Sequence, residues 1–475
     1  IHAILQRGQR VSIVFNQAAR IFGKNVRGAH VLLWASGVVL LICVLRFLFF
    51  YAAFVQDPAL PIDPDSMDYI EPALSLLKNG TYADGFGNPS FRRPPGYAAI
   101  VAGLYALFGA GNLLAVVIFQ NLVFFASSIL VVLIAFWMGG LATMVIAAAL
   151  FLSHFITFYY SNEVLNETIF TFLVLLSVVC LVASVQAKRI RLGWILSAGT
   201  ILTAATFVRP VSLYLFYPLA LLLAIFAFQQ RKNWPDAARA CAVFFLPWII
   251  LGGLWYARNL QELGHFQFVG QQSEVLRERS TLLIARIENI PEPEVVNFYQ
   301  KHVGENTVSL ASHLKFYNRY PFQYLGISME SVLVTLFSPA QWHYKFYFPD
   351  YPRDREAFTS HILLGDFPAV LRAVGSWDAE NILLLIGILF HSVILVVGAL
   401  IPLVVSNNWR LPNFKFLGFS YLVIFYMLIL VFLWGGSARF NVPNIPFLAI
   451  LAGYGYASLF QSLFGVSLLR KLDSD

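Results

Sequence analysis

Residues 31–55 read VLLWASGVVLLICVLRFLFFYAAFV, an apolar run that contains one charge, Arg46. A transmembrane helix needs about 20 consecutive apolar residues, so this run predicts a membrane span in which Arg46 pairs inside a helix bundle. The loop that follows holds three carboxylates, Asp63, Asp65 and Asp68. They are expected near the bilayer edge, where carboxylates disfavour burial in lipid and repel one another. The loop is therefore a candidate for chemistry at the membrane surface.

The composition extends this interpretation to the whole chain. Of its 475 residues, 59% are hydrophobic and 12% are charged, whereas a soluble domain carries about 25% charged residues. An all-α polytopic membrane protein is predicted. The net charge of +7 lies mostly in short loops between apolar runs, as membrane topology requires, so no nucleic-acid partner is expected. The cysteines lie inside apolar runs and show no disulfide or metal pattern; they are Cys43, Cys180 and Cys241.

Apolar runs divide the chain into about ten spans, with both ends in the cytoplasm. The long runs are 31–55, 114–138, 141–160, 168–187, 240–257, 381–404, 416–434 and 441–464, and the short ones are 193–208 and 211–228. The short segment 95–110 is interpreted as a juxtamembrane or re-entrant helix. With it placed outside, all basic loops fall on the cytoplasmic side, as the positive-inside rule requires.

This topology predicts four regions. Residues 1–29 form a basic amphipathic segment on the cytoplasmic face, and 30–257 form an N-terminal membrane region whose first outer loop is 57–113. Residues 258–380 form an outer-face segment of several short helices, such as Tyr320–Phe337. Residues 381–475 hold the last membrane helices and a short cytoplasmic tail.

The same topology collects charged side chains from distant segments on the outer face. These residues are Asp63, Asp65, Asp68, Glu71, Arg92, Arg93, Glu163, Glu167, Arg209, Arg258 and Arg439. Arginine binds phosphate through a two-pronged fork and stays charged in any environment, and an aspartate can take a proton from an attacking hydroxyl or amine. The combination indicates a site that handles an anion and a proton.

Each part of this set has another interpretation. The segment 63–68 could be a solvated loop of Asx turns, or its acids could bind a divalent metal. Glu163 and Glu167 could favour a helix N-terminus. Arg209 and Arg439 could anchor helix ends by snorkelling to the interface.

The order of the outer motifs points to a known group of enzymes. The motifs are Asp65-Ser-Met-Asp-Tyr69 with Arg93-Pro-Pro-Gly-Tyr97, Glu167-Thr-Ile-Phe-Thr-Phe-Leu173, Arg209-Pro210, Trp255-Tyr-Ala-Arg-Asn259 and Arg439-Phe-Asn-Val-Pro443. From about Arg46 to Tyr456 the chain resembles the GT-C membrane glycosyltransferases, in particular the group of protein O-mannosyltransferases and lipid A aminoarabinose transferase. It departs from them at Ala98, where a proline is usual, and it lacks the paired Asp-Glu of the eukaryotic mannosyltransferases.

The resemblance implies an inverting transfer of one sugar from a polyprenyl-monophosphate donor. The acceptor would be a lipid, glycan or protein at the outer face of a membrane, most simply the bacterial inner membrane with its site toward the periplasm or exterior. Asp65 would be the base, with Asp68 as the second choice, and Glu167 would orient the acceptor or assist. The residues expected to bind substrate are Arg93, Tyr97, Glu163, Arg209, Arg258 and Arg439. No cofactor is implied, although a divalent metal is left open.

Two other functions compete with this one. A transporter or flippase of a lipid-linked sugar would place polar residues near the middle of the bilayer, whereas the charges here lie at the outer ends of the spans, with Arg46 the main exception. A scaffold without catalysis could be built on the same fold.

Overall fold

The structure of the chain is a computed structural model. It describes residues 26–186, 190–270, 272–290, 310–337, 379–405 and 414–464, together with residues 295, 303, 368, 372 and 375. Most of the segment 1–29, much of 258–380 and several basic positions used for the topology lie outside these residues; the basic positions are Lys188, Arg189, Arg410, Arg470 and Lys471. Within the described ranges the fold is helical, and the one β feature is an isolated bridge between Ala83 and Pro89. The predicted all-α membrane fold is confirmed.

The described ranges contain fifteen helices. They are α2 (Val26–Gln56), α3 (Met67–Asn79), α4 (Gly96–Phe108), α5 (Leu113–Leu152), α6 (Phe155–Asn162), α7 (Glu167–Gln186), α8 (Leu192–Val208), α9 (Phe216–Arg231), α10 (Trp234–Leu263), α11 (Gln272–Glu288), α13 (Leu310–Arg319), α14 (Pro321–Phe337), α17 (Ala379–Val405), α18 (Phe414–Trp434) and α19 (Ile445–Phe464). In the part of the chain that the structure describes, three 3-10 turns lie between them, η1 (Pro64–Ser66), η2 (Pro210–Ser212) and η5 (Ala438–Asn444).

Seven helices of the described chain are long and apolar enough to cross a membrane. They are α2, α5, α7, α10, α17, α18 and the continuous stretch of η5 with α19. Three further apolar helices, α4, α8 and α9, are shorter. Helix length and hydropathy therefore identify an integral membrane protein, but they do not confirm the predicted count of about ten spans.

Helix α5 folds back on itself. Its backbone leaves the helical region at Gly139 and Gly140, and Gly140 has a φ of 72°, which favours glycine. The rings of Phe124 and Phe151 have centroids 5.2 Å apart, although a straight helix would separate these positions by roughly 40 Å. Two antiparallel arms therefore meet at the boundary between the predicted runs 114–138 and 141–160.

Arg46 lies among these arms. Its guanidinium carbon is 4.4 Å from the centre of the Phe124 ring. It donates to the carbonyl of Leu152 and, at 3.4 Å, to Oγ1 of Thr157. The charge is therefore held inside the bundle, as expected for an arginine within a span.

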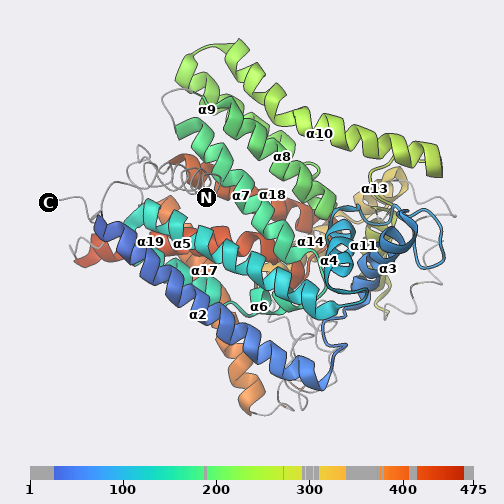
Figure 1. Ribbon diagram of the computed structural model, residues 1–475, viewed down its shortest axis with the longest axis horizontal. Helices are drawn as coiled ribbons and strands as arrows, with labels where there is room; N and C mark the ends of the chain where they lie inside the picture. The colour runs from blue at the N-terminus through green and yellow to red at the C-terminus, as the bar shows by residue number, and fades with distance from the viewer. Residues whose placement is uncertain are drawn as a thin grey trace, which may run out of the picture.

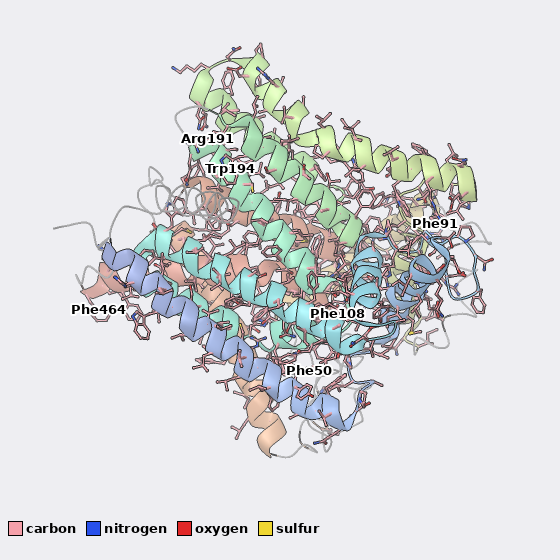
Figure 2. The ribbon with its side chains drawn as sticks, in the orientation of Figure 1. Phe50, Phe91, Phe108, Arg191, Trp194 and Phe464 are labelled. Atoms are coloured by element: carbon pink, nitrogen blue, oxygen red, sulfur yellow. The ribbon has the colours of Figure 1, made fainter. Side chains whose placement is uncertain are left out.

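The outer elements gather at one end of the bundle. Figure 1 shows α2 and α10 along opposite edges, with α5, α7 and α8 between them, and α3, α4, α11 and α13 together at one end. Figure 2 shows Phe91 of the first loop at that end, and Arg191, Trp194 and Phe464 toward the other end. The first loop and the basic position Arg191 thus lie on opposite sides of the bundle.

Candidate active site

A small turn presents the first candidate residue. The carboxylate of Asp63 caps η1 by accepting the N–H of Asp65 at 3.0 Å, and Oγ of Ser66 accepts the N–H of Asp63 at 2.9 Å. Pro64 occupies the first position of the turn, where its missing N–H costs nothing. Asp63 therefore stabilises the turn 63–66, whereas the carboxylate of Asp65 makes no hydrogen bond within this turn.

Arg439 joins the first loop to the membrane helices. It lies in η5, where its Nη1 donates to Oδ2 of Asp65 and its Nε donates to Oε1 of Glu167. Nη1 of Arg209, directly after α8, binds the same Oε1 of Glu167 at 2.8 Å. One glutamate at the start of α7 thus holds two arginines that come from distant turns.

Arg93 extends the cluster toward α3. Its Nη2 lies 3.2 Å from Oδ2 of Asp65, and its Nε donates to Oδ2 of Asp68 at 3.0 Å. At the rim, Arg92 binds Oδ1 of Asp68 at 3.1 Å and Glu274 of α11 at 3.2 Å. We call the inner part of this cluster the charge network; it consists of Asp65, Asp68, Arg93, Glu167, Arg209 and Arg439.

The charge network and the Arg92 rim beside it together run from the protein interior to solvent. The side chain of Glu167 is 0% exposed, that of Asp65 is 35% exposed and that of Arg92 is 52% exposed. Glu167 is therefore out of reach of a bulky acceptor, while Asp65 can meet one.

The two neighbouring aspartates differ in acidity. Burial raises the pKa of Asp63, and the hydrogen bond from the N–H of Asp65 offsets this only in part. Burial also acts to raise the pKa of Asp65, but the charges of Arg439 and Arg93 outweigh it and hold that pKa below its ordinary value. Asp65 is therefore an ionised carboxylate at neutral pH.

Backbone and amide contacts hold the segments of the network together. Nδ2 of Asn166 donates to the hydroxyl of Tyr69 at 2.8 Å and to the carbonyl of Val208 at 2.9 Å. The ring of Tyr69 lies beneath Arg93, 5.6 Å from its guanidinium carbon. Sequence reasoning singled out neither Asn166 nor Glu274, because an Asn beside Glu167 and an acid in the long outer segment carry no local signal.

Gly96 permits the approach of α4 to the end of α8. A Cβ at this position would lie 2.6 Å from the carbonyl carbon and oxygen of Phe207, which is too close for any side chain. Arg93, three residues before the start of α4, therefore lies close enough to Arg209 for the two charges to interact.

Three predicted site residues lie outside the charge network. Arg258 donates to the carbonyls of Ser90 and Tyr82 at 2.9 and 3.2 Å and pairs with Glu262 at 2.7 Å, contacts that anchor the 82–90 turn to α10. The buried hydroxyl of Tyr97 donates to Oε1 of Gln120 at 2.5 Å. Nε2 of the same glutamine binds the backbone carbonyl of Glu163 at 2.5 Å. The substrate-binding roles of Tyr97, Glu163 and Arg258 stay predictions.

The metal alternative was drawn from the spacing of the first-loop acids. Within the described ranges, no three side chains of His, Cys, Asp or Glu gather in a way that could hold a metal ion. The carboxylates of the charge network are each bonded to arginine.

Comparison with known proteins gives matches among solved structures. No protein-family model and no curated protein matches the chain. The chain is similar to ArnT from Cupriavidus metallidurans bound to undecaprenyl phosphate, with 13% identity and a TM-score of 0.38 over 90% of this chain and 77% of that chain. It is also similar to ArnT from the same organism in the apo state, with 15% identity and a TM-score of 0.37 over 92% and 78% of the two chains.

Both similarities are at low sequence identity and low TM-score. At this level of similarity the activity has to be inferred from the site alone. Chemically, the site offers three arginines for an anion and one half-exposed, ionised aspartate beside them.

Proposed function

We propose that the protein is an inverting glycosyltransferase that uses a polyprenyl-monophosphate sugar as donor. The observation that carries the proposal is the bridge from Arg439 to both Asp65 and Glu167, with Arg93 and Arg209 alongside. An acid able to take a proton and arginines able to bind a phosphate thus meet in one cluster at one end of the bundle. One similar structure, that of ArnT from Cupriavidus metallidurans, holds undecaprenyl phosphate, the class of lipid assigned here to the donor.

The reaction would proceed in one displacement. A hydroxyl or amine of the acceptor attacks the anomeric carbon on the face opposite the phosphate, and its proton passes to Asp65. The bond between the anomeric carbon and the phosphate oxygen breaks, and the polyprenyl phosphate leaves with one more negative charge. Preorganised arginines stabilise that developing charge, Arg209 and Arg439 first and Arg93 next to them.

The contacts favour Asp65 over Asp68 as the base. In the described part of the chain, the arginine contacts of Asp65 all use Oδ2, which leaves Oδ1 for a proton. Both oxygens of Asp68 bind arginine, Oδ1 to Arg92 and Oδ2 to Arg93. Glu167 is fully buried between two arginines, so we assign it the task of positioning them.

The membrane is proposed to be the bacterial inner membrane, with the site on its periplasmic or external side. The acceptor is a lipid, glycan or protein. The half-exposed Asp65 lies where a lipid-borne sugar and an acceptor from either phase could meet.

Substitution of the base tests this proposal. The donor is first identified by mass spectrometry of lipid that co-purifies with the protein, and release of polyprenyl phosphate is then followed. Asp65→Asn should abolish release while the protein stays folded and still binds donor. Asp84→Asn is the matched control, because Asp84 is a partly exposed acid in the same loop whose hydrogen bonds stay within residues 84–88; it should keep full activity.

Full activity in Asp65→Asn would remove the base assignment. A labelled donor that crosses liposomes without cleavage would favour a transporter instead.

A further inference from the structure

Two carboxylates already accept hydrogen bonds from the N–H groups of Arg439 that a phosphate would use. A guanidinium can bind two oxygens of a phosphate along either of two edges, which we call its faces. One face is made by Nε with Nη2 and the other by Nη1 with Nη2. Glu167 occupies Nε of Arg439 and Asp65 occupies its Nη1. Each face is therefore half taken by a carboxylate, and a phosphate can use a complete face only by displacing one of them.

Arg209 and Arg93 show the same competition to different degrees. The side face of Arg93 is taken by Asp68 at Nε and by Asp65 at Nη2. The carboxylate contact of Arg209 in the described part of the chain uses Nη1, which leaves its face of Nε and Nη2 for an anion. A phosphate can therefore bind Arg209 first and then compete for Arg439.

Asp65 is the carboxylate that gives way more easily. Glu167 is fully buried and would leave a desolvated charge behind if its bond to Arg439 were broken. Asp65 is 35% exposed, keeps Arg93 as a partner, and can be hydrated when phosphate takes its place on Arg439. The cost of separation is thus lower on the Asp65 side.

We propose that the donor phosphate competes with Asp65 for Arg439, so that binding of the donor frees the carboxylate that accepts the proton. The inference rests on the proposed function and adds that donor binding controls the basicity of Asp65. Without donor, Asp65 is neutralised by two arginines and is a weak base. With donor, it keeps only Arg93 and becomes more basic, in agreement with the large part that Arg439 plays in lowering its pKa. Without donor, Asp65 is therefore a poor proton acceptor for water.

Competition has a testable consequence because coupling between two sites is reciprocal. If phosphate weakens the contact of Asp65 with Arg439, removal of the Asp65 charge must strengthen the binding of phosphate. The expected sign is unusual, since loss of an ordinary substrate contact weakens binding.

The experiment measures binding of farnesyl monophosphate, a short isoprenyl monophosphate, to the full chain in detergent by titration calorimetry at one pH and ionic strength. Asp65→Asn and Asp65→Ser are both measured, so that one remains if the other fails to fold by circular dichroism. Both should bind at least about 5-fold tighter than the unmodified protein, the lower end of typical couplings between sites.

Two controls separate this competition from a general field effect. Asp68→Asn removes the same charge three residues away, from a side chain bonded to Arg92 and Arg93 and not to Arg439; it should tighten binding clearly less. Glu330→Gln, which removes an acid paired with Arg286 at 2.8 Å, should leave the affinity unchanged.

The outcomes also separate the two proposals. Measurable binding by the unmodified protein that is unchanged or weaker in both Asp65 variants, or equally tightened by Asp68→Asn, overturns the competition and leaves the proposed function standing. Absence of binding in the unmodified protein and in every variant overturns both. Binding that emerges only in the Asp65 variants supports the competition.

Discussion

The substitution Glu167→Gln is expected to destabilise the protein strongly. Glu167 is 0% exposed and is bonded to two arginines, Arg209 at 2.8 Å and Arg439. Glutamine keeps the shape and removes the charge, so two arginines with low exposure are left facing each other without their shared acid. Removal of one partner from a buried ion pair costs about 3–5 kcal/mol, and we expect the free energy of unfolding to fall by roughly that amount.

The assay is detergent-induced unfolding followed by circular dichroism, with Glu330→Gln as the matched control. Glu330 forms a bidentate pair with Arg286 at 2.8 Å, but both side chains are partly exposed. Pairs of that kind contribute about 0–1 kcal/mol. If Glu167→Gln lowers the free energy of unfolding no more than Glu330→Gln does, the network does not depend on a buried charge and the reasoning is refuted.

Three further substitutions probe single parts of the site. Gly96→Ala should lower the free energy of unfolding by about 1–3 kcal/mol, because its Cβ meets the Phe207 carbonyl; thermal unfolding measures this, and an unchanged midpoint would contradict the close approach. Arg209→Lys replaces a fork by a point charge and should weaken farnesyl monophosphate binding about tenfold, that is, by about 1.4 kcal/mol, whereas equal affinity would exclude Arg209 from the phosphate site. Arg258→Met should speed hydrogen exchange in the 82–90 turn, which Arg258 anchors, and should change the affinity for farnesyl monophosphate by no more than about twofold. A loss of affinity as large as that of Arg209→Lys would show that Arg258 binds the phosphate.

Much of the candidate site could be predicted because membrane topology follows from composition. A run of about 20 apolar residues has one stable arrangement in lipid, and basic loops select its orientation. These two rules are enough to bring Asp65, Glu167, Arg209 and Arg439 to one side of the membrane without any knowledge of packing. The break at Gly139 and Gly140 was also visible as a boundary between two apolar runs, because glycine adopts a positive φ at little cost.

Placement on one side did not decide which charges touch. Arg258 and Arg209 look alike in the sequence, each in an outer motif beside a span, yet one anchors a turn and the other binds Glu167. Tyr97 stands in the same motif as Arg93 but points to Gln120 beneath the charge network. The direction of each side chain depends on how the helices pack, and the spacing of residues along the sequence does not predict it.

Hydropathy and charge act locally along the chain, and they are enough to predict a bundle of membrane helices with acids and arginines at one end. The contacts of Arg439 with Asp65 and Glu167, which precede it by 374 and 272 residues, could not be read from any local pattern. Contacts over such separations arise when α7, the first loop and η5 converge. A buried glutamate needs a charged partner, and helix packing decides which distant arginines can supply it.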